Sequence, residues 1–155
     1  MINRDQLATV FGIGHTIWIP GLAASLLALS LAILVVSAVG YWLVWLLTLA
    51  LVIIGLRVTG SYCDAHAKWP PIECVIDRFA GVFLISCFMP LFMPSWFGAL
   101  IAFHLVINRK VWPIPEVEKL MEPGPRLMLD DLIAAALAIP VGWMVYFISL
   151  MIGLY

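Results

Sequence analysis

The stretch from Thr16 to Leu56 contains no Asp, Glu, Lys or Arg, and this feature most narrows what the chain can fold into. A helix needs about 20 residues to cross a hydrocarbon core of ~30 Å. The stretch is roughly twice that length, so we predict two membrane-spanning helices joined by a turn near residues 39–41. Gly40 interrupts the apolar run there, and the neighbouring Trp42 and Trp45 suit a membrane interface.

Two further apolar blocks follow, from Phe79 to Asn108 and from Leu132 to Tyr155. Pro90 and Pro94 divide the first of these blocks, because proline disfavours a continuous helix. We interpret it as two short helices that meet at a proline-containing turn, with one long kinked span as the alternative. The last block is predicted to be a single span.

The composition agrees with a membrane protein. The chain has 155 residues, of which 65% are hydrophobic and 11% charged, and its mean hydropathy is +1.11. Soluble domains carry about 25% charged residues. We therefore predict an all-α, polytopic integral membrane helical bundle of about five hydrophobic helical segments, which forms a single transmembrane domain over residues 1–155.

Charged residues are confined to the segments outside the apolar blocks. With five helical segments in series, the N-terminus and the loops 57–78 and 108–131 lie on one face of the membrane. That face then carries all eight Lys and Arg residues and all nine Asp and Glu residues. Because basic loops favour the cytoplasmic side, we predict a cytoplasmic N-terminus and a C-terminus on the opposite side.

The charge pattern also bears on the class of function. The net charge of −1 argues against nucleic acid as a partner. A transport path usually needs ionisable groups or broken helices near the membrane midplane. Polar residues gathered at one interface therefore favour chemistry at that interface over transport.

Three carboxylates stand where charged loops meet apolar segments. Asp77 precedes the third segment, and Asp130 and Asp131 precede the fifth. Each could cap a helix N-terminus, where acidic side chains are favoured. Adjacent helical residues point about 100° apart, so one of the pair could cap while the other faces neighbouring helices. Three carboxylates that converge from two segments would suit Mg²⁺, which prefers oxygen ligands.

The loop between these junctions contains NRKVWPIP, residues 108–115. Its WPIP is predicted to be an extended turn, since a residue before proline is biased away from the helical conformation. Lys110 is interpreted either as a snorkelling anchor or as a ligand for an anionic lipid head group. His104 and His15 are interpreted as satisfied polar residues rather than ligands.

Four segments of the chain resemble, in the same order, the motifs of the bacterial phosphatidylglycerophosphatase A family of integral membrane phosphatases. They are GIGHTIWIPGLAASLLAL (12–29), ECVIDRFAG (73–81), FHLVINRKVWPI (103–114) and LMLDDLIAA (127–135). The matching positions are Gly12, Gly14, Pro20, Gly21 and Ser25; Val75, Asp77 and Gly81; Phe103, Lys110, Trp112, Pro113 and Ile114; and Met128, Asp130, Asp131 and Ala134.

The resemblance implies a Mg²⁺-dependent hydrolase of the bacterial inner membrane. Such an enzyme removes the terminal phosphate of phosphatidylglycerophosphate at the cytoplasmic leaflet and leaves phosphatidylglycerol. The resemblance implies Asp77 and Asp130 as catalytic residues, and Asp77, Asp130 and Asp131 as metal ligands. Apart from the resemblance, the cationic side chains of Lys110 and Arg78 are predicted to bind the phosphate of the substrate, Arg78 by a bidentate contact.

Several polar positions of the family are replaced in this chain. Arg78 stands where the family has Glu, Ile107 where it has Asp, and Leu22 where it has Thr. His104 likewise replaces an Arg. Two hypotheses follow: a divergent lipid phosphatase that uses the remaining carboxylates, or a non-catalytic relative that serves as a membrane subunit or a lipid-binding accessory protein.

Overall fold

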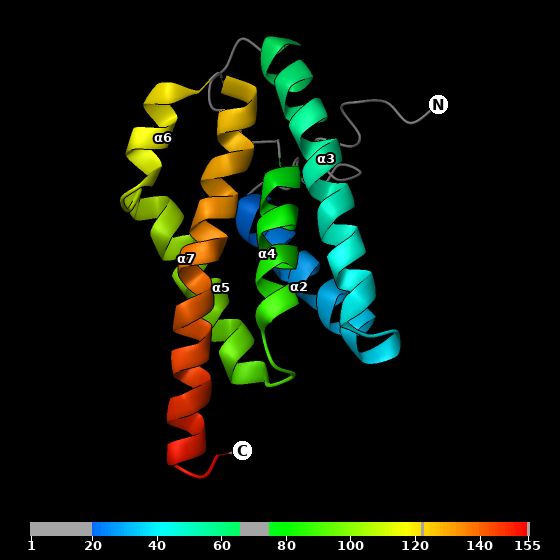
Figure 1. The fold of residues 1–155 in the computed structure, drawn as a ribbon, viewed down its shortest axis with the longest axis vertical. Helices are drawn as coiled ribbons and strands as arrows, with labels where there is room; N and C mark the ends of the chain where they lie inside the picture. Colours follow the sequence, from blue (N-terminus) through cyan, green and yellow to red (C-terminus); the bar gives the residue numbers. More distant parts are fainter. Residues whose placement is uncertain (1–19, 66–74, 122, 155) are drawn as a thin grey trace.

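The structure, a computed structural model, describes residues 20–65, 75–121 and 123–154 (Figure 1). These residues form helices joined by short connections, and no strand occurs among them. The all-α expectation is therefore confirmed for the described part of the chain. In chain order the helices are α2 (Pro20–Ala38), α3 (Tyr41–Ala65), α4 (Ile76–Phe88), α5 (Met93–Arg109), α6 (Ile114–Leu120) and α7 (Pro123–Met151).

Three helices among the described residues are long and apolar enough to cross a membrane. Their candidate spans are Gly21–Ala38 in α2, Tyr41–Thr59 in α3 and Pro125–Met151 in α7. α4 and α5 have 13 and 17 residues and are not among these candidates. The chain is thus a helical membrane protein with helices at all five expected positions, three of which have the length of a span.

Both predicted turns are present and lie close together. α2 ends at Ala38 and α3 begins at Tyr41, and Gly40 between them has a φ of 109°, which glycine adopts at little cost. α4 and α5 form two separate helices joined by residues 89–92, as the prolines predicted. The Tyr41 hydroxyl donates a hydrogen bond of 2.8 Å to the Met89 carbonyl, which ties the first turn to the second.

Two expectations about helix starts are wrong. α7 begins at Pro123, so Asp130 and Asp131 lie about two turns inside the helix instead of at its N-cap. The WPIP segment is not extended throughout, because α6 begins at Ile114 and holds Pro115 in its first turn. In both cases the reason is that a proline in the first helical turn loses no intrahelical hydrogen bond.

α4 is the central element of the bundle. It packs against α2, α3 and α7, and α7 packs in turn against α3 and α5 (Figure 1). Gly81 of α4 marks the closest approach: a Cβ atom there would lie 2.8 Å from Cζ of Phe103 and 3.2 Å from the backbone oxygen of Asp131. The absence of a side chain at Gly81 therefore lets α4 contact both α5 and α7 at the level of Asp131.

The charged residues of the described part gather at one end of the bundle. They lie in the C-terminal part of α3, at the start of α4, at the end of α5, in α6 and in the first turns of α7. Figure 1 shows these helix ends together, opposite the turn at residues 39–40, the turn at 89–92 and the C-terminus. Arg4 and Lys68 lie outside the described residues, and the assignment of this end to the cytoplasm stays a prediction.

The contact at Gly81 yields a stability prediction. Gly81→Ala should lower the free energy of unfolding by about 1–3 kcal/mol, because the new methyl overlaps the buried Phe103 ring and a backbone oxygen. Gly55→Ala is the matched control, since its Cβ would meet only the flexible end of the Met128 side chain. The control should be neutral or stabilising, because Ala is the better helix former.

The measurement is the midpoint of thermal unfolding of the two variants and the parent in the same mild detergent. An unchanged or raised midpoint for Gly81→Ala would contradict the proposed close approach of α4 to α5 and α7.

Candidate functional site

Asp77 lies in the first turn of α4 and is buried, with 2% of its surface exposed. Its Oδ1 accepts a hydrogen bond of 2.8 Å from the backbone N–H of Arg78. The first N–H groups of a helix have no partner within the helix, so Asp77 stabilises the start of α4, although Val75 is the N-cap residue. Burial raises the pKa of the Asp77 carboxyl to about 6, while the Arg78 charge and the backbone hydrogen bond act in the opposite direction.

Arg78 connects α4 to α7 through an ion pair. Its Nε lies 3.1 Å from Oδ2 of Asp131, and the two side chains are 24% and 4% exposed. The contact is ionic in character, because Oδ2 accepts no hydrogen bond of good geometry. Asp77 and Asp130 also act electrostatically on Asp131. The Arg78–Asp131 contact thus links α4 to α7, and the charges of Asp77 and Asp130 act on the same Asp131 carboxylate.

Two further elements approach Arg78. A Cβ atom at Gly21, the second residue of α2, would lie 3.7 Å from Nε of Arg78. Burial and, to a lesser extent, the charge of Arg78 lower the pKa of His104 on α5, so the two side chains interact electrostatically. Arg78 therefore stands where α2, α4, α5 and α7 meet at the charged end of the bundle.

Lys110 ends α5 at the same end of the bundle. It has a φ of 45° at the C-cap position, its backbone N–H bonds the Ile107 carbonyl at 3.2 Å, and its side chain is exposed. A left-handed residue at a helix end is a common way to stop the helix. The local conformation of Lys110 is explained by this role, and its binding of a phosphate beside Arg78 stays a prediction.

The predicted metal ligands are Asp77, Asp130 and Asp131. Among the described residues, no group of three His, Cys, Asp or Glu side chains is arranged to hold a metal ion. The Arg78 guanidinium already places a positive charge against Asp131, where a cation would otherwise bind. In this arrangement the carboxylates do not fit Mg²⁺ as a set.

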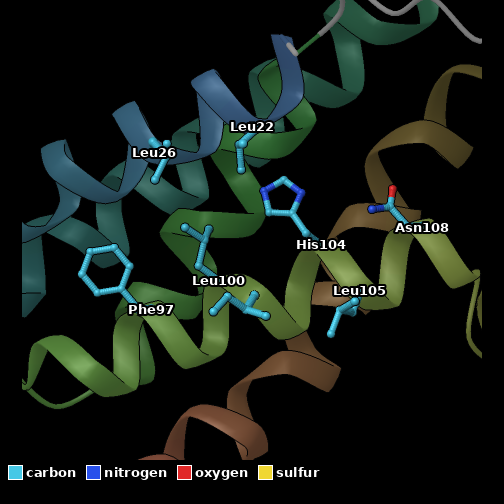
Figure 2. Close-up of a pocket in the computed structure, with 8 residues that line it drawn as sticks. Leu22, Leu26, Phe97, Leu100, His104, Leu105 and Asn108 are labelled. Atoms are coloured by element: carbon cyan, nitrogen blue, oxygen red, sulfur yellow. The ribbon is translucent and has the colours of Figure 1, made fainter. Parts of the chain in front are cut away.

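A groove between α2 and α5 was missed by the sequence reasoning (Figure 2). It has a volume of about 310 Å³.

The Nε2 atom of His104 is buried without a hydrogen-bond partner, so the interpretation of this residue as satisfied is wrong. The sequence contained one indication of this groove. His104 and Asn108 are four residues apart, so on a helix they lie on the same face. Gly12, Gly14 and His15 lie outside the described residues.

These features define a helical membrane protein with a buried, ion-paired acidic site at the charged end of its bundle. The sequence profile of the family described as phosphatidylglycerophosphatase A matches residues 6–146. The chain therefore belongs to this family, and the match includes every candidate site residue. No curated protein and no solved structure matches the chain at a significant level.

The ion pair yields a prediction on coupling. Arg78→Met should destabilise the protein by on the order of 3 kcal/mol, because it leaves a buried carboxylate without its cation. Asp131→Leu should have a similar effect. The double variant should lose less than the sum of the two, with a coupling of about 1–3 kcal/mol.

The free energy of unfolding of each variant in mixed detergent micelles measures this coupling. Arg78→Met combined with Ser149→Ala is the control pair, since Ser149 bonds only the Val145 carbonyl of its own helix. The control pair should be additive; additivity of the Arg78 and Asp131 changes would contradict the ion pair.

Proposed function

We propose that this chain is a membrane lipid phosphatase that hydrolyses the terminal phosphate of phosphatidylglycerophosphate to give phosphatidylglycerol. Family membership supports this activity. The observation that carries the proposal is the meeting of three family-like segments around Arg78: Gly21 of α2, Asp77 of α4 and Asp131 of α7.

The proposed roles follow from the chemistry of each group. Arg78 presents five N–H donors and contacts Asp131 through Nε. Its terminal nitrogens would bind the phosphate, together with Lys110. Asp130 or Asp77 would accept a proton from water as the general base. The water oxygen attacks phosphorus and the bond to the glycerol oxygen breaks. The base passes the proton that it accepted from water to that oxygen, which leaves phosphatidylglycerol and inorganic phosphate.

Mg²⁺ is the cofactor that the family resemblance implies, and Asp77, Asp130 and Asp131 are the ligands expected from the sequence. Since these carboxylates do not fit the ion in the arrangement described above, no step of the proposed reaction passes through it. Titration of Mg²⁺ in the activity assay tests this cofactor directly.

The proposed location follows from the charge pattern. We place the protein in the bacterial inner membrane with its charged end and N-terminus in the cytoplasm, and its C-terminus on the opposite side. The partner of the site is then a phospholipid head group of the cytoplasmic leaflet.

A second candidate function has one specific observation in its favour. In the ion pair with Arg78, the charge of Asp131 is neutralised by the chain itself. A metal-dependent hydrolase would need this carboxylate to bind its metal ion. A non-catalytic relative could keep this pair as a structural link between α4 and α7 and serve as a lipid-binding accessory protein or as a subunit for other membrane proteins.

Phosphate release from phosphatidylglycerophosphate by the purified protein, with Mg²⁺ and with a chelator, decides between the two. The parent should release phosphate. Of the variants Asp130→Asn and Asp77→Asn, the one that removes the general base should slow release by about 100-fold or more. Ser30→Ala is the matched control: Ser30 is an exposed residue of α2 that bonds only the Leu26 carbonyl. It should keep the parent rate.

Arg78→Glu separates the remaining outcomes. In an active phosphatase it should abolish phosphate binding and activity. An inactive parent that gains Mg²⁺-dependent activity with Arg78→Glu would sink the phosphatase proposal and support the accessory role.

A further inference from the structure

The groove between α2 and α5 has apolar walls along most of its length. Leu22 and Leu26 of α2 form one wall, and Phe97 and Ile101 of α5 contribute to the other. Figure 2 shows Phe97 and Leu26 toward one end, and His104 and Asn108 toward the other. The volume of about 310 Å³ lies at the lower end of the ~300–1,000 Å³ range of ligand pockets. The groove therefore suits a slender apolar ligand with one polar part.

The position of the groove decides where such a ligand comes from. Leu26, Phe97 and Ile101 are 43%, 49% and 61% exposed, and the α2 wall belongs to a candidate span. The outward face of a membrane span contacts hydrocarbon instead of water. A ligand that enters from this side is a lipid chain.

The polar end of the groove adjoins the ion-paired site. His104 leaves its Nε2 atom buried without a hydrogen-bond partner and lies within the electrostatic reach of Arg78. Leu22, on the opposite wall, follows directly after Gly21, whose Cβ position lies 3.7 Å from Nε of Arg78. From the charged end of the bundle along the groove, the order is therefore the Arg78 cation, the unpaired Nε2 of His104 and the apolar walls.

A glycerophospholipid presents its parts in the same order: a phosphate, an ester carbonyl and an acyl chain. We infer that the groove binds one acyl chain of the phospholipid whose head-group phosphate lies at Arg78, and that His104 Nε2 donates a hydrogen bond to the ester carbonyl. This inference rests on the proposed function for the identity of the site, and it adds the way in which the site holds the lipid in the membrane.

The test uses the purified full chain in lipid nanodiscs with phosphatidylglycerophosphate that carries a photoreactive diazirine on one acyl chain. Crosslinked peptides, mapped by mass spectrometry, should concentrate on the groove residues of α2 and α5. Leu26→Trp and Ile101→Trp, which fill the groove from opposite walls, should reduce this crosslinking by about tenfold.

Leu31→Trp is the matched control, because Leu31 lies on the same helix as Leu26 with a nearly equal exposure of 44% but does not line the groove. It should crosslink as the parent does. His104→Phe keeps the ring and removes the nitrogens, so it should weaken crosslinking without filling the groove.

Competition with unlabelled lipids identifies the occupant. Phosphatidylglycerophosphate should displace the label and phosphatidylcholine should not. Equal displacement by both lipids, or equal crosslinking in Leu26→Trp and Leu31→Trp, would overturn the inference.

The crosslinking and the phosphate-release assay fail independently. Groove crosslinking in a protein that releases no phosphate leaves the binding inference standing and removes the hydrolase. Phosphate release without groove crosslinking would leave the hydrolase proposal standing and overturn the inference that the groove binds the acyl chain.

Discussion

The ion pair between Arg78 and Asp131 is the contact on which both the fold and the site depend. Removing a buried carboxylate's cation is strongly destabilising, so α4 and α7 must remain in register at this point. Gly81, one turn after Arg78, provides the space for that register by bringing the backbone of α4 against the Asp131 carbonyl. Because α4 also packs on α2 and α3, the same contact fixes the position of Gly21 beside Arg78.

The sequence was sufficient for the order of the helices and the gathering of charge at one end. These features depend on long apolar runs, on Gly40 and on the prolines of residues 90–94. Such residues determine where helices begin and end through local backbone preferences, which do not depend on tertiary packing. The starts of α6 and α7 differ from the expectation: the WPIP segment was expected to be extended, and the last helix was expected to begin near Asp130 and Asp131. In the first turn of a helix a proline is well tolerated, and only the structure shows on which side of each proline the helix lies.

The sequence predicted which carboxylates belong to the candidate site, but it did not predict that Asp131 pairs with Arg78. Asp77, Asp130 and Asp131 could be expected to approach one another, since they lie near helix ends at the same end of the bundle. The partner of Asp131 depends on the rotation of α4 relative to α7, which the contact at Gly81 sets and which local sequence does not encode. The unpaired Nε2 of His104 has the same origin, because it depends on the space left between α2 and α5.

A fixed arginine and a bound metal ion are not equivalent in such a site. Both can neutralise a phosphate, but only a metal ion lowers the pKa of a bound water and so generates a strong nucleophile near neutral pH. With Arg78 against Asp131, the proposed phosphatase would neutralise the phosphate with a residue of the chain, and activation of water would fall to a carboxylate alone. In the proposed function, binding of a phospholipid and hydrolysis of its phosphate would therefore depend on different residues: Arg78, His104 and the groove for the first, and Asp130 or Asp77 for the second. A chain built in this way can lose hydrolysis and still hold its lipid, which is the physical distinction between the two functions considered for this protein.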